Sequence, residues 1–138
     1  MTIPFTLHPQ LVADCHLIGR CGVLHLLLHR NAMLPWFIVV PETDVTELYE
    51  LPESSRRALL DFADKLARFI KRHFVCEKIN IAAIGNVVPQ LHLHVVGRRS
   101  DDNCWPLAPW GHLSATRHYD PEELLRITEA IASELSVR

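Results

Sequence analysis

The chain has 138 residues, of which 49% are hydrophobic, and a formal net charge of −2 at pH 7. This length predicts one domain, residues 1–138, with a buried core. The slightly acidic balance argues against a general nucleic-acid-binding protein, because no excess of lysine and arginine is available for phosphate contacts. No apolar run approaches the roughly 18 residues that a membrane-spanning helix needs, so no membrane partner is expected.

The N-terminus and the cysteines predict a cytoplasmic protein. The first residues, MTIPFTLH, lack the basic-then-apolar order of a signal peptide. The cysteines show no metal-ligand spacing, and nothing marks the chain as secreted. We interpret them as reduced thiols with packing roles: Cys15, Cys21, Cys76 and Cys104.

The first part of the chain predicts three strands. Residues 14–19 and 22–29 are strand candidates, joined by a tight hairpin over residues 19–22, which begins and ends with glycine. His29 ends the second candidate and is interpreted as a structural histidine. The compact apolar run over residues 36–40 predicts a third strand, which we expect at the centre of the sheet.

Helical patterns follow. Residues 45–50 suggest a short helical turn, and from about residue 52 to about residue 74 apolar side chains recur with the spacing of an amphipathic helix. Residues 77–84 then predict a strand. Near the end of the chain, Asp120 suits an N-cap and Pro121 a first helical position, so a final helix is expected.

The most informative stretch is residues 84–99, IGNVVPQLHLHVVGRR, in which apolar and polar side chains alternate. Such alternation predicts a half-buried strand, on which residues two apart share a face. The polar row would consist of Gln90, His92 and His94. The core would receive Leu91, Leu93 and Val95.

Two imidazoles in one row admit three interpretations. They can be structural histidines on a polar strand face, ligands of a metal ion, or the site of nucleophilic catalysis by a neutral imidazole. A structural metal site needs further ligands, and no C-x-x-C or H-E-x-x-H motif supplies them.

The segment GNVVPQLHLHVV closely resembles the signature of the histidine triad (HIT) superfamily of nucleotide hydrolases and transferases. The usual signature is G-Q-x-φ-x-H-φ-H-φ-H-φ-φ, in which φ is apolar. Gly85 and Asn86 match the G-Q pair, and His92 and His94 match the second and third histidines. Gln90 stands where the family has its first histidine.

The resemblance implies a metal-independent mechanism without a cofactor. His92 would attack the α-phosphorus of a nucleoside phosphate derivative, and water would hydrolyse the nucleotidyl-histidine. The imidazole must be neutral, with one nitrogen donating to the backbone carbonyl of Gln90 and the other free to attack. The Gln90 side chain would donate to the phosphate. His94 would act there as a cation or a hydrogen-bond donor. Asn86 would donate its amide to a phosphate oxygen, with a turn-forming asparagine as the competing interpretation.

The resemblance also suggests contacts with the nucleotide outside the signature. Asn31 is the candidate for the ribose hydroxyls, although it can equally be an ordinary turn asparagine. Trp36 stands where many relatives have a further histidine, which removes an ionisable group. Residues 100–119 show no periodicity, and there Trp105, with Trp110, is a candidate for packing in the nucleotide pocket or for plain hydrophobic anchoring.

The expected fold is an α+β, HIT-like domain. Its core, residues 10–100, should be a five-stranded antiparallel sheet with one long helix. Residues 101–138 should form a tail rich in Trp and Pro, followed by the C-terminal helix. The resemblance further implies a homodimer formed through the long helix and the sheet edge.

We therefore predict a nucleotidyl hydrolase or transferase that acts on dinucleoside polyphosphates or nucleoside phosphoramidates. One alternative is a nucleotide-binding protein with little catalysis, because Gln90 and Trp36 depart from the family pattern. Another is a metal-dependent enzyme in which His92 and His94 share a metal ion with a third histidine, His112 or His118.

Overall fold

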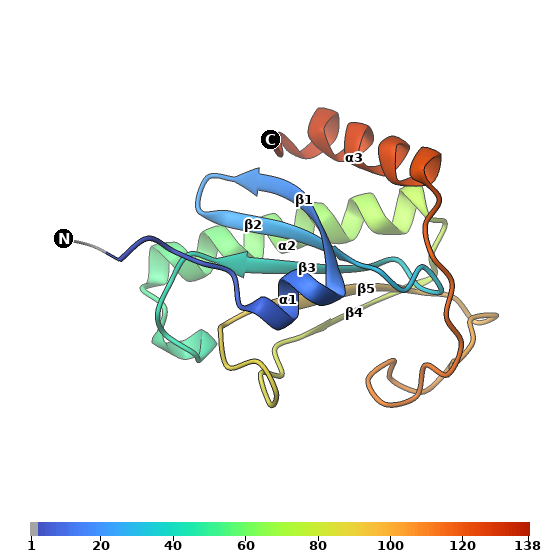
Figure 1. Ribbon diagram of the computed structural model, residues 1–138, viewed down its shortest axis with the longest axis horizontal. Coiled ribbons are helices and arrows are strands. Elements are labelled where there is room, and N and C mark those ends of the chain that lie inside the picture. Colours follow the sequence, from blue (N-terminus) through green and yellow to red (C-terminus); the bar gives the residue numbers. More distant parts are fainter. Residues whose placement is uncertain (1–2) are drawn as a thin grey trace.

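The computed structural model describes residues 3–138, and it confirms the expected α+β fold with a five-stranded antiparallel sheet (Figure 1). The strands are β1 (Cys15–Cys21), β2 (Leu24–His29), β3 (Trp36–Pro41), β4 (Lys78–Ala82) and β5 (Leu93–Arg98). The helices are α1 (Pro9–Asp14), the 3-10 turn η1 (Leu48–Glu50), α2 (Glu53–His73) and α3 (Pro121–Leu135). The strand order is β1-β2-β3-β5-β4, so β3 is central, as its sequence predicts.

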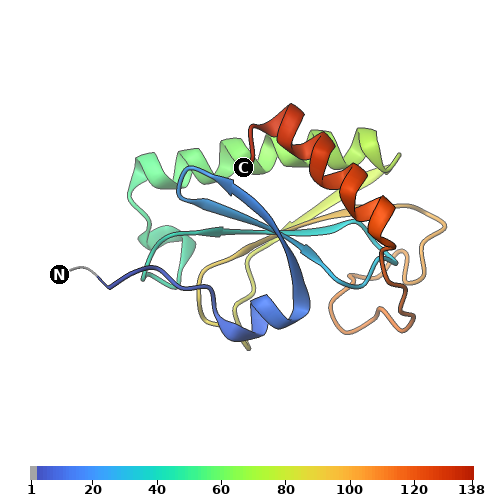
Figure 2. The same cartoon turned by 45° about the horizontal axis from the view of Figure 1, so that its top comes forward.

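Both faces of the sheet are covered. Helices α2 and α3 lie on one face, whereas α1 and the tail that precedes α3 lie on the other (Figure 2). Alternate residues of β3 serve the two sides: Phe37 and Val39 pack toward α2, and Trp36, Ile38 and Val40 pack toward α1 and the tail. Burial on both faces explains why β2 and β3 are nearly continuous apolar runs.

The two long helices agree with their sequence patterns. Helix α2 buries a stripe at helical spacing, namely Leu59, Phe62, Ala63, Leu66, Phe69 and Ile70. Helix α3 begins at the expected N-cap, where Asp120 accepts a hydrogen bond from the Glu123 amide at 2.8 Å. Pro121 occupies the first helical position, which needs no N–H donor.

Three details differ from the sequence-based expectations. The short helix α1 was not predicted. Strand β5 begins at Leu93 and not near Pro89, because β3 pairs only as far as Leu93 and residues 85–92 form an irregular loop. Gly19 lies inside β1 and not in the hairpin, whose turn is at Gly22 and Val23. A Cβ atom at Gly19 would come within 2.8 Å of the Val137 side chain, so the C-terminus requires glycine there.

The structure bears on the expected thiols and on the expected absence of a membrane span. All four cysteines are free. Across residues 3–138, no helix combines the length and the apolar character that crossing a bilayer requires.

A buried ion pair links the tail to the sheet. The Arg98 side chain, with Arg98 only 1% exposed, donates to both carboxylate oxygens of Asp102 at 2.9 and 3.0 Å and to Asn80 Oδ1 at 3.0 Å. The Trp105 ring packs over the same guanidinium, whose central carbon lies 5.6 Å from the ring centroid. The pair therefore fixes where the tail leaves β5.

Removing the Asp102 charge should destabilise the protein. In Asp102→Asn the buried guanidinium loses its counter-charge, and we expect a loss of about 3–5 kcal/mol in the free energy of unfolding. Urea denaturation measures this loss. The matched control is Asp101→Asn, because Asp101 pairs with Arg99 in solvent and should contribute little. Equal losses in both variants would contradict the assignment.

Candidate active site

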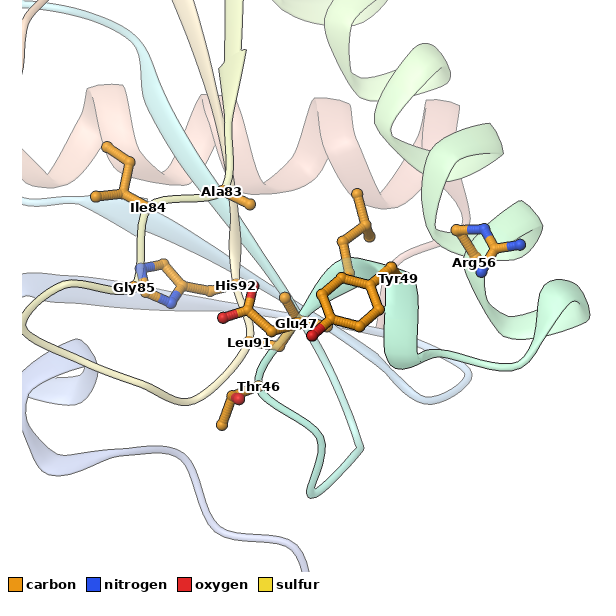
Figure 3. A pocket seen from close by; sticks show the side chains of 10 residues that line it. Thr46, Glu47, Tyr49, Arg56, Ala83, Ile84, Gly85, Leu91 and His92 are labelled. Atoms are coloured by element: carbon orange, nitrogen blue, oxygen red, sulfur yellow. The ribbon is translucent and has the colours of Figure 1, made fainter.

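Two cavities meet at His92. The first, of about 500 Å³, lies among α1, β2, β3, the loop 85–92 and the tail, and we call it the Trp cavity because Trp36 and Trp110 line it. The second, of about 580 Å³, is the Glu47 cavity. Figure 3 shows Glu47 and Tyr49 on one side of it, and His92 with residues 83–85 on the other. A group bound in either cavity can therefore reach His92.

His92 has the orientation that a nucleophilic imidazole needs. Its Nδ1 lies 2.7 Å from the backbone oxygen of Gln90, which is the hydrogen bond that the resemblance implies. Because a carbonyl oxygen can only accept, Nδ1 carries a proton, and in the neutral imidazole the lone pair is therefore on Nε2. The side chain is largely buried, with 7% of the residue exposed, yet it lines both cavities.

His94 is neutral, which corrects the expectation that it acts as a cation. Its Nδ1 accepts a hydrogen bond from the indole Nε1 of Trp36 at 3.0 Å. Burial, with smaller contributions from His92 and His29, lowers the pKa of His94 from 6.5 to about 3. The alternative role, a hydrogen-bond donor through Nε2, remains open to it.

The Gln90 side chain lines neither cavity, which argues against the expected contact with a phosphate. Its Oε1 accepts from the His8 amide at 2.8 Å and its Nε2 donates to the Thr6 carbonyl at 2.9 Å. Both ends of the amide are thus used to hold the N-terminal segment. Only the backbone carbonyl of Gln90 takes part in the site.

Asn31 and Asn86 both line the Trp cavity, in different ways. The Asn31 amide donates to the Ala115 carbonyl at 3.0 Å, and its oxygen accepts from the amides of Met33 and Arg117 at 3.1 and 3.2 Å. Asn31 therefore holds the tail against the end of β2. Asn86 lies exposed on the loop 85–92, where its amide can approach a ligand.

The tail brings Trp110 to the site and leaves Trp105 outside it. Trp105 is 38% exposed, packs on Arg98 and is not among the residues that line either cavity. Trp110 contacts His94 and Trp36 edge-on, with ring centroids 5.3 and 5.6 Å apart. Of the two candidates in the tail, Trp110 therefore lines the Trp cavity and Trp105 does not.

Several residues of the site were not predicted from the sequence. Asp14 and Gln10 of α1 line the Trp cavity, and the Asp14 carboxylate accepts from the Gln10 side chain at 3.0 Å. His29 stacks on Trp36 at 4.9 Å, so it belongs to the aromatic wall of the Trp cavity as well as to the strand. A histidine and a proline at positions 8 and 9 were the only signal for α1, since His8 caps it and Pro9 starts it.

The arrangement of side chains that could bind a metal ion does not support a metal site shared by His92 and His94. Within residues 3–138, no three His, Cys, Asp or Glu side chains come together as a metal site would require. His112 bonds to the Ala108 carbonyl on the exposed tail, and neither His112 nor His118 lines a cavity with His92.

Known proteins match this chain in sequence and in fold. The model of the HIT domain family matches residues 10–101. Histidine triad proteins of known structure superpose closely. The one from Bradyrhizobium japonicum is 32% identical, with a TM-score of 0.88, over 94% of this chain and 97% of the other. The one from Sinorhizobium meliloti is 34% identical, with a TM-score of 0.88, over 94% and 96%.

A third histidine triad protein, from Marinobacter aquaeolei, is 34% identical, with a TM-score of 0.88, and the match covers 96% of each chain. No curated protein matches the sequence.

The neutral state of His94 predicts how stability depends on pH. The unfolded chain binds a proton at this residue below pH 6.5, whereas the folded chain does so only near pH 3. The contribution to stability is therefore complete above pH 6.5 and is lost as the pH falls, by up to about 1.4 kcal/mol per pH unit. Urea denaturation between pH 7 and pH 4 measures this slope.

The variant His94→Asn should flatten that slope, because asparagine does not titrate and its oxygen can still accept from Trp36. The exposed His112→Asn serves as the control and should keep the slope of the unmodified protein. Identical slopes in all three proteins would contradict the burial of a neutral His94.

Proposed function

This chain belongs to the HIT domain family, and on that premise we propose that it cleaves the α-phosphate linkage of a nucleoside phosphate derivative through His92. The observation that carries the proposal is the hydrogen bond from His92 Nδ1 to the Gln90 carbonyl at 2.7 Å. In the neutral ring this bond leaves the lone pair on Nε2, in a residue that lines two cavities. A neutral imidazole so oriented is a competent nucleophile toward phosphorus.

The reaction needs two displacements. In the first, the Nε2 lone pair forms a bond to the α-phosphorus while the bond to the leaving group breaks, and the leaving group departs with that electron pair and takes a proton from solvent. In the second, water attacks phosphorus and loses a proton, and the electron pair of the P–N bond returns to Nε2. The product is a nucleoside monophosphate.

The composition of the cavities supports one orientation of the substrate. The Trp cavity has aromatic walls, which suit a base, and at its edge the Asp14 carboxylate, which can accept from ribose hydroxyls. Asn31 could share that contact, although its amide already bonds to the backbone. The leaving group of a dinucleoside polyphosphate or a nucleoside phosphoramidate would then extend into the Glu47 cavity.

Two donors are placed to bind the phosphate. The Nε2–H of His94 belongs to a ring whose centroid lies 4.9 Å from that of His92. Asn86 contributes an exposed amide from the loop that lines the same cavity. Donors fixed in a partly buried site stabilise developing negative charge more than they would in water.

The nucleophile assignment predicts a specific loss. His92→Ala should reduce release of AMP from adenosine phosphoramidates and diadenosine polyphosphates by at least about 1,000-fold, because no other group can form the covalent intermediate. Chromatographic assay of AMP measures turnover, and His112→Ala is the control with an intact site.

Retained turnover in His92→Ala would exclude this nucleophile. Calorimetric titration with AMP on the same proteins separates the alternative that the departures at Gln90 and Trp36 suggested. Tight AMP binding by the unmodified protein without any product would favour a nucleotide-binding protein with little catalysis.

We also propose a homodimer that forms through β4 and α2. Strand β4 is an edge of the sheet, so its outer backbone groups are unpaired within the chain. Ile81 on β4 and Leu60 on α2 are 46% and 41% exposed, and Ile84 follows β4 with 39% exposed. Pairing of two β4 strands would cover these side chains and extend the sheet.

Ile81→Lys should disrupt this dimer, because two lysines would then meet near the two-fold axis. Light scattering should give twice the chain mass for the unmodified protein and the chain mass for the variant. Leu17→Lys on β1, the opposite edge strand, is the matched control and should remain dimeric. A monomeric unmodified protein would rule the dimer out.

A further inference from the structure

The indole of Trp36 determines where His94 carries its proton. The indole Nε1–H can donate but has no lone pair with which to accept. Since it lies 3.0 Å from Nδ1 of His94, that nitrogen must be the unprotonated one. A neutral His94 therefore carries its proton on Nε2. A histidine at position 36 would impose no such choice, because its ring nitrogens can exchange donor and acceptor roles.

The donor and the acceptor are both held in place. They come from adjacent central strands, β3 and β5, whose register pairs Ile38 with His94 and Trp36 with Val96. Trp36 is 7% exposed and His94 is 8% exposed. The ring of Trp36 packs between His29, stacked at 4.9 Å, and the edge of Trp110 at 5.6 Å. The indole cannot turn away without disturbing this packing.

His92 and His94 consequently hold their protons on opposite nitrogens. His92 donates from Nδ1 to the Gln90 carbonyl, and His94 accepts at Nδ1 from Trp36. The rings are 4.9 Å apart. One ring offers a lone pair at Nε2, and its neighbour offers an N–H at the same position. This pair matches what attack on a phosphoryl group requires, a nucleophile beside a donor for the non-bridging oxygen.

We propose that Trp36 is a positioning residue that keeps His94 as a neutral Nε2–H donor beside the nucleophile. The catalytic part of this inference rests on the function proposed for His92, whereas the tautomer itself does not. Protonation of His94 would set a second donor against the indole N–H. His94 then serves as a fixed dipole over the working pH range and not as a proton-transferring acid.

The charged and titratable groups around His94 are compatible with this state. His92 precedes it on its own segment, His29 faces it from β2, and Asp14 lines the same cavity from the end of α1. The two histidines disfavour a further positive charge. The Asp14 carboxylate, the one anion in this group, is exposed and accepts a hydrogen bond from the Gln10 side chain.

The first test reads the tautomer directly and needs no substrate. Two-bond ¹H–¹⁵N correlation spectra of histidine-labelled protein should show His94 protonated at Nε2 alone from pH 8 to pH 5. In Trp36→Phe, which keeps an aromatic ring but has no donor, His94 should show both tautomers and should titrate at a higher pH, by about one unit. A His94 protonated at Nδ1 in the unmodified protein would overturn the proposal.

The second test is kinetic. Trp36→Phe should lower kcat by roughly 10- to 100-fold, as expected when a partner that orients a functional histidine is removed, and its pH–rate profile should gain an acid limb. Trp36→His should recover part of kcat, because its ring can donate, but should retain the acid limb. The control is Trp105→Phe, the same substitution outside both cavities, with kcat and pH profile unchanged.

The outcomes separate this inference from the proposed function. A protein without turnover, but with His94 fixed as the Nε2–H tautomer through Trp36, would refute the function and support the positioning role. Turnover with an unchanged kcat, pH profile and tautomer in Trp36→Phe would refute the positioning role alone. Thermal melting confirms that each variant is folded, and if Trp36→Phe does not fold, the spectrum of the unmodified protein and the Trp36→His profile decide.

Discussion

The antiparallel pairing of β3 with β5 sets the positions of both the core residues and the site residues. Phe37, Val39, Leu93 and Val95 of these strands pack toward α2, and Trp36, Ile38 and His94, which alternate with them, line the Trp cavity. Because side chains alternate across a pleated strand, the register that buries the core also sets the site residues side by side. A slip of one residue would bury the histidines under α2, so the fold and the site depend on the same strand register.

Two hydrogen bonds then fix which nitrogen of each imidazole carries the proton. In water each imidazole would exchange freely between its tautomers, and each would be protonated in part near neutral pH. Here the Gln90 carbonyl can only accept and the Trp36 indole can only donate, so each ring has one permitted arrangement of its proton. Neither partner is ionisable, which means that the orientation of the pair does not itself change with pH.

The sequence was informative where a pattern is local and silent where a contact is long-range. Alternation placed Leu91, Leu93 and Val95 in the core, as observed, because the period of a strand is a property of the backbone. The fate of the Gln90 side chain could not be predicted, since its partners, Thr6 and His8, lie more than 80 positions away. Residues 100–119 have no periodicity, so nothing local distinguished Trp110 from Trp105. Which of the two lines the Trp cavity depends on the buried Arg98–Asp102 pair, because this pair fixes the start of the tail.

By the family resemblance, Gln90 and Trp36 stand where relatives have histidines, and neither residue can be protonated. His94 is held neutral as well. A phosphate at His92 would therefore meet oriented dipoles, the His94 Nε2–H and the Asn86 amide. Among the described residues that line the Trp cavity there is no lysine or arginine, whereas Arg56 lines the Glu47 cavity. Dipoles fixed by the fold need no reorganisation as charge develops, so such a site favours the transition state over the ground-state anion. On this argument, fewer ionisable groups would change how the charge is stabilised without removing the proposed nucleophile, His92.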